Sequence, residues 1–130
     1  MTFKSSVNIK FDLGKAEFFE RYIPTPSHAE VLRGLLRGFN GEGSRAHIVV
    51  GPYGTGKSLI GTLISGVVSK TVEPKVFEVL MKKFDQVDDE IYEELDKIRN
   101  HECVYLPVIL NGYEGHFRQA ILSAIMRVLR

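Results

Sequence analysis

The residues whose types and spacing could support chemistry lie between positions 48 and 63, in the segment IVVGPYGTGKSLIGTL. Three β-forming residues, Ile48 to Val50, precede a glycine-rich turn. Lys57 and Ser58 then begin a segment whose apolar residues recur at helical spacing. The spacing GxxxxGK[ST] between a strand and a helix is the pattern of a phosphate-binding loop, or P-loop.

The chemistry of such a loop accounts for each residue type. Gly51, Gly54 and Gly56 let the backbone adopt angles that a Cβ would oppose, so that its N–H groups can point inward. These donors meet the N-terminus of a helix, which favours phosphate. Lys57 would reach the β- and γ-phosphate oxygens, and the Ser58 hydroxyl would bind Mg²⁺. The predicted nucleotide-binding loop comprises Gly51, Pro52, Tyr53, Gly54, Thr55, Gly56, Lys57, Ser58 and Leu59.

Composition limits the class of protein. A chain of 130 residues is expected to form one domain, and 44% apolar and 25% charged residues are ordinary values for a soluble globular chain. The formal net charge of +1 gives no electrostatic reason to expect a nucleic-acid or membrane partner. The single cysteine, Cys103, excludes an internal disulfide framework and is expected to be a small buried apolar residue. Without a membrane span or a signal peptide, the expected compartment is the cytoplasm.

Apolar periodicity predicts the elements around this loop. Alternation at Val7, Ile9 and Phe11 indicates a short strand or extended arm. Ser27 and Glu30 have the spacing of a capping box, which predicts a helix from Ser27 to about Asn40. Strands are expected at about 46–50 and at 103–110, where Pro107 favours a sheet edge. Helices are expected after the P-loop, over 76–99 as one helix or a pair broken near Gln86, and from Phe117 onward.

Strand, P-loop, helix, strand and helix in this order indicate the start of a parallel α/β fold. With the preceding residues included, the chain resembles the N-terminal part of AAA+ ATPases, especially the origin-recognition/initiator and STAND-like branches. In those families a Tyr-apolar-Pro element precedes a helix that leads into the P-loop strand. Tyr22-Ile23-Pro24 occupies that place here, and Asn111 follows the second predicted strand as in those families. Large bacterial P-loop ATPases of phage-defence systems are also similar at the P-loop.

The resemblance implies a three-layer P-loop NTPase sandwich with a parallel sheet, incomplete in this chain. Residues 1–45 would form an arm and helix leading into the ATPase domain, and 46–130 its N-terminal part, with a helical insertion at 72–100. The implied ligands are ATP and Mg²⁺, with Tyr22 and Ile23 against the adenine. ATP would then be coupled to assembly or to DNA-related work such as initiation or defence. A homo-oligomer, and a DNA or protein partner held by a C-terminal part, are further expectations; a membrane is not.

The catalytic half of such an ATPase is not identified. Hydrolysis needs an apolar strand that ends in an acidic residue, which holds Mg²⁺ and orients water. Asp88 to Glu90 follow a helix-spaced segment, and Glu114 lies in a turn, so the chain alone is expected to lack hydrolysis. Two alternatives remain open: a nucleoside or small-molecule kinase, and a non-enzymatic module in which ATP orders a surface and the acidic helices recruit a partner.

Other residues with chemical potential favour ordinary roles. The four histidines, at positions 28, 47, 101 and 116, are too scattered in the sequence for a metal site. They are expected to be structural or solvated. Arg45 lies beside the P-loop strand and could touch phosphate or DNA, but an exposed loop arginine is the favoured interpretation.

Overall fold

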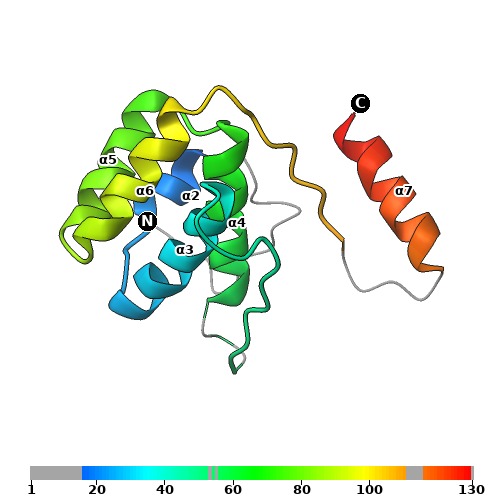
Figure 1. The fold of residues 1–130 in the computed structure, drawn as a ribbon, viewed down its shortest axis with the longest axis horizontal. Helices are drawn as coiled ribbons and strands as arrows, with labels where there is room; N and C mark the ends of the chain where they lie inside the picture. The colour runs from blue at the N-terminus through cyan, green and yellow to red at the C-terminus, as the bar shows by residue number, and fades with distance from the viewer. Residues whose placement is uncertain (1–15, 53, 55, 111–115, 130) are drawn as a thin grey trace.

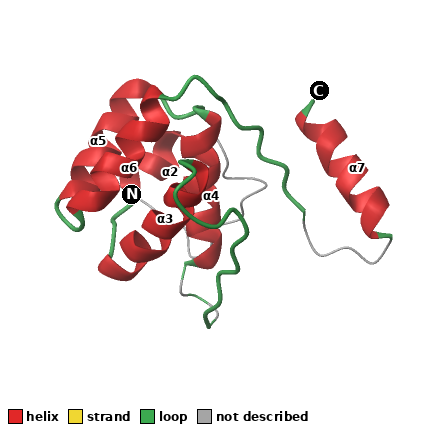
Figure 2. Ribbon diagram, in the orientation of Figure 1, coloured by secondary structure: helices red, strands yellow, loops and turns green. Residues whose placement is uncertain are grey.

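The computed structural model describes residues 16–52, 54, 56–110 and 116–129, and these contain six α-helices. The helices are α2 (Ala16–Arg21), α3 (Pro26–Phe39), α4 (Lys57–Ser69), α5 (Pro74–Asp85), α6 (Asp89–Asn100) and α7 (Phe117–Val128), as Figure 1 shows. Figure 2 shows that these described residues contain helices and loops but no strand.

Helices α2 to α6 form a bundle around one apolar core. Helix α6 lies against α5, α3 and α4, and α2 lies against α5. Each helix contributes side chains that are almost fully buried, including Phe19, Leu32, Leu63, Leu80 and Leu95. Helix α7 stands apart from the bundle, at the end of an extended segment (Figure 1). The core therefore forms between helices alone, without a sheet beneath them.

The start of α3 differs from the prediction, whereas its end agrees with it. Thr25, not Ser27, is the N-cap: its backbone is extended and its hydroxyl accepts a hydrogen bond of 3.3 Å from the His28 N–H. Pro26 occupies the first turn, where its missing N–H costs nothing and its fixed φ suits the helix. The helix ends at Phe39, and Gly41 has the positive φ of 80° that often follows a helix C-terminus.

The prediction of a helical pair broken near Gln86 is confirmed. Helix α5 ends at Asp85, and Asp88 caps α6 by accepting a 3.0 Å hydrogen bond from the Glu90 N–H. The acidic residues here are more than a solvated surface. Asp88 also accepts a 2.6 Å bond from Arg33 of α3, and the buried Glu94 carboxylate accepts one of 2.6 Å from Asn40. These bonds join α6 to α3.

The predicted α/β P-loop sandwich with a parallel sheet is wrong for the described residues. Residues 46–50 and 103–110 have no regular secondary structure, and the side chains of Ile48 and Val50 are 90% and 85% exposed. A β-prone segment becomes a strand only where a neighbouring strand takes up its backbone hydrogen bonds. The two segments do not pair with each other, so β propensity alone builds no sheet. Cys103, expected to be buried, is exposed for the same reason.

The remaining predicted elements are two helices and an N-terminal arm, and the structure describes only the helices. The helices predicted after the P-loop and from Phe117 are confirmed as α4 and α7. Pro74 begins α5, where its missing N–H costs nothing and its fixed φ suits the first turn. The predicted arm at Val7 to Phe11, together with Asn111 and Glu114, lies outside the described residues.

The packing of α2 on α4 is tested by two glycine substitutions. A Cβ at Gly66 would overlap the ring of Phe19, which is 1% exposed, whereas a Cβ at Gly34 in α3 meets nothing within 4 Å. We expect Gly66→Ala to lower the free energy of unfolding by about 1–3 kcal/mol through overpacking. Gly34→Ala should raise it by up to about 1 kcal/mol through helix propensity. Urea denaturation measures both, and equal stability of the two variants would contradict this packing.

Candidate phosphate-binding site

The glycine-rich loop enters α4 through two left-handed backbone positions. Gly54 has a φ of 83° and Gly56 a φ of 90°, conformations that residues with a Cβ rarely adopt. Gly56 is the N-cap of α4, and its carbonyl accepts the first bond of the helix from the Ile60 N–H at 3.0 Å. The glycines therefore stand where the turn requires them. Tyr53 and Thr55, also predicted for this site, lie outside the described residues.

The first turn of α4 has no side-chain cap. Gly56 offers no side-chain acceptor, and no side-chain hydrogen bond caps the described part of this terminus. The opening N–H groups of a helix have no partners within the helix, and together they carry its positive partial charge. Within the described residues, the first turn of α4 thus presents backbone donors that no side chain caps.

The Lys57 side chain folds back over the loop. Its Nζ donates to the Gly51 carbonyl at 2.5 Å and to the Pro52 carbonyl at 2.9 Å. The ammonium group is thereby held over the loop that leads into α4. Ser58, the second residue of α4, is exposed, and Leu59 is partly buried against the core. The structure therefore brings Gly51, Pro52, Gly56 and Lys57 close together.

The two residues predicted to contact adenine lie in different environments. Tyr22 is 4% exposed and packs on Phe84 with ring centroids 5.7 Å apart, whereas Ile23 is 76% exposed. The Tyr22 hydroxyl lies 3.1 Å from His28 Nδ1, and the two rings are stacked with centroids 6.3 Å apart. Burial raises the pKa of the Tyr22 phenol above its ordinary value, so the hydroxyl keeps its proton.

His28 is the residue that sequence reasoning missed. A Cβ on Gly56 would lie 2.8 Å from both Cε1 and Nε2 of the His28 ring, so the imidazole is packed against the N-cap of α4. Tyr22 therefore meets the loop through His28. The sequence placed His28 only in the first turn of a helix, and no spacing rule relates position 28 to position 56.

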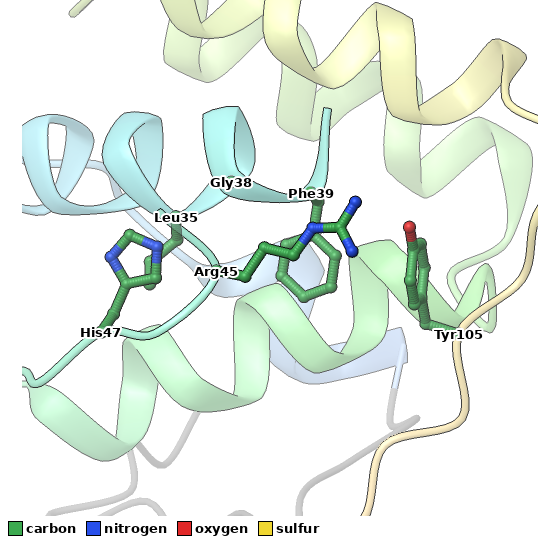
Figure 3. Close-up of a pocket in the computed structure, with 6 residues that line it drawn as sticks. All are labelled: Leu35, Gly38, Phe39, Arg45, His47 and Tyr105. Carbon is green, nitrogen blue, oxygen red and sulfur yellow. The ribbon is translucent and has the colours of Figure 1, made fainter. Parts of the chain in front are cut away.

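A hollow lies at the C-terminal end of α3, away from the glycine-rich loop, and is drawn in Figure 3. Its volume is about 110 Å³, and its lining comprises Leu35, Gly38, Phe39, Arg45, His47 and Tyr105. Phe39 and Tyr105 meet edge to face with centroids 4.9 Å apart, and the Arg45 side chain extends toward the space between them. His47 is held by a 2.6 Å hydrogen bond between Nε2 and the Ser44 carbonyl. Arg45, predicted as an exposed loop arginine, is exposed and lines this hollow.

The part of the chain that the structure describes has neither a metal-binding cluster nor a membrane-spanning helix. There, no group of three or more His, Cys, Asp or Glu residues could hold a metal ion. None of the described helices is long and apolar enough to cross a membrane.

Comparisons with protein-family models, with curated proteins and with solved structures find no match. The resemblance to AAA+ ATPases therefore rests on sequence patterns alone, namely the P-loop spacing, the Tyr22-Ile23-Pro24 element and Asn111 after the second predicted strand. The helical fold of the described residues contradicts it, because the parallel sheet that carries the loop in those proteins is missing from them.

The buried Tyr22 phenol predicts a loss of stability in alkali. Its pKa is 10.0 in the unfolded chain and higher in the folded one, so unfolding releases a proton above pH 10.0. The stabilisation is therefore complete below pH 10.0 and decreases as the pH rises toward the folded-state pKa. Urea denaturation at neutral pH and above pH 10.0 measures it. Tyr22→Phe should flatten this decrease, whereas Tyr92→Phe, which leaves Tyr22 in place, should retain it; equal behaviour of the two variants would contradict the assignment.

Proposed function

We propose that residues 51–58, with the first turn of α4, bind the phosphate groups of a nucleoside triphosphate, namely ATP with Mg²⁺. The observation that carries the proposal is the position of the Lys57 ammonium group, which lies over the Gly51 and Pro52 carbonyls. It is adjacent to the glycine N-cap of a helix whose first turn has no side-chain cap. The chain would then act as a nucleotide-binding module.

Binding would exchange weaker hydrogen bonds for stronger ones. The Lys57 ammonium donates to two neutral carbonyl oxygens, and a phosphate oxygen would be a charged acceptor in their place. The Coulomb attraction between the ammonium and a negatively charged phosphate oxygen would add to the hydrogen bond, which a neutral carbonyl cannot match. The N–H groups of the α4 first turn would donate to the same phosphate groups, helped by the helix dipole.

Ser58 supports the inclusion of Mg²⁺. Its side chain is exposed at the second position of α4, directly after the lysine. Mg²⁺ prefers oxygen ligands and usually combines one or two protein oxygens with phosphate oxygens and water. A serine hydroxyl beside bound phosphates satisfies that preference, and the ion would neutralise part of their charge.

The proposal is limited to binding. Binding needs a loop of backbone donors, a cation and a helix N-terminus, and the proposal rests on the last two, Lys57 and the first turn of α4. Hydrolysis would also need a carboxylate that orients water, and phosphotransfer would need a site for the acceptor. The coupling of ATP to assembly or DNA-related work, and the alternative of a kinase, therefore remain predictions from the sequence alone.

Replacement of Lys57 tests the proposal. Lys57→Ala removes a charged hydrogen-bond donor that contributes about 1.5–3 kcal/mol, so the Kd for ATP–Mg²⁺ should rise by about 10- to 100-fold. Calorimetric titration measures this. Lys75→Ala, which removes the same charge from an exposed position in α5, should leave the Kd unchanged. Equal affinities of the Lys57 variant and the original chain would refute the proposed site.

A further inference from the structure

The segment that ends in α7 exposes an unusual amount of apolar surface. We call the described residues 103–110 the arm, and the arm together with α7 and Leu129 the arm–helix unit. Figure 1 shows this unit extending away from the bundle. Ten of its apolar side chains are between 37% and 73% exposed: Val104, Tyr105, Leu106, Val108, Leu110, Phe117, Leu122, Ile125, Met126 and Leu129.

Helix α7 is apolar around more than half of its circumference. At 3.6 residues per turn, one apolar side comprises Leu122, Ile125, Met126 and Leu129, and a neighbouring one comprises Ala120, Ile121, Ala124 and Val128. The first side is exposed, whereas the second is partly or fully buried. Helices with so broad an apolar surface are normally covered on more than one side. The exposed side of α7 therefore lacks a cover in the single chain.

The backbone N–H and C=O groups of the arm can also form hydrogen bonds with a partner. Among the described residues, its backbone makes one hydrogen bond to another element, from the Tyr105 N–H to the Val68 carbonyl at 3.1 Å. An extended apolar segment with unpaired N–H and C=O groups is a template for pairing with another extended segment. Pro107 interrupts the donors at one position only.

We propose that the arm–helix unit docks against the same unit of a second copy of this chain. The two arms would pair along their backbones, and the two α7 helices would cover each other's exposed apolar sides. Such an interface is isologous, which means that one patch is complementary to itself across a two-fold axis. Two protomers can also exchange an element when that element projects at the end of an extended segment, and α7 projects in this way at the end of the arm.

Area and charge support a second copy as the occupant. Aromatic side chains have about 150–250 Å² to bury and aliphatic ones less, so these ten residues, which are between 37% and 73% exposed, present on the order of 1,000 Å² per copy. A stable interface buries about 800 Å² per partner, so this surface is sufficient. The described part of the unit has no acidic residue and two basic ones, Arg118 and Arg127. Arg118 lies four residues before Leu122, in the first turn of α7 at one end of the exposed side, and both long side chains can reach solvent. Few like charges would therefore meet.

The test is the mass of the full chain in solution without nucleotide, measured by light scattering from low to high micromolar concentration. We expect a dimer, and we expect Leu122→Glu with Met126→Glu to raise its dissociation constant by at least about tenfold. The bundle core excludes both residues, so helical content and urea stability of the bundle should persist. Val79→Glu, which adds one such carboxylate at a 47% exposed position on α5, should leave the dimer intact.

A second variant tests the arm separately from α7. Val108→Pro removes one backbone N–H from the arm, so it should also weaken the dimer, whereas Lys57→Ala should not. A chain that is monomeric at every concentration would overturn the proposal, including one that binds vesicles or another protein as a monomer. A dimer that tolerates the glutamate pair as well as it tolerates Val79→Glu would overturn it too. Both outcomes leave the proposed phosphate site unaffected.

Discussion

The packing of α6 between α3 and α5 is the constraint on which the rest of the bundle depends. Ile91, Leu95 and Ile98 of α6 are at most 3% exposed, and they join the core that α3, α4 and α5 share. Polar bonds at the edge of this contact set its register. Arg33 reaches the α6 N-cap Asp88 at 2.6 Å, and Asn40 reaches the buried Glu94 at 2.6 Å. These two bonds tie the C-terminal half of α3 to α6.

The position of α3 in turn determines the surroundings of the glycine-rich loop. Helix α3 begins with Thr25 and Pro26, and this start places His28 in its first turn. The His28 ring then lies against Gly56, and the buried Tyr22 hydroxyl holds it from the other side at 3.1 Å. A larger residue at position 56 would be opposed both by the positive φ and by this ring. The loop thus depends on core packing as well as on its own glycines.

The sequence predicted the helices better than the rest of the fold, because helical hydrogen bonds are local. The apolar spacing in α4, the break near Gln86 and the helix from Phe117 are all present. The strands at 46–50 and 103–110 failed because a strand needs a partner that no local pattern guarantees. The start of α3 was misplaced because a threonine followed by proline competed with the Ser27 capping box, and the fixed φ of proline favoured the earlier start.

The sequence by itself determined the chemical character of the loop. Its glycines, lysine and serine lie at the N-terminus of a helix because that placement depends only on their spacing along the chain. Gly54 and Gly56 adopt the positive φ that only glycine adopts readily, and α4 begins at Lys57. Only the tertiary structure decided that this helix enters a bundle and not a sheet, that Tyr22 is enclosed while Ile23 is exposed, and that His28 packs on Gly56. These outcomes depend on contacts between residues far apart in sequence, whose energies are set by the packing of whole helices and not by the residues on either side.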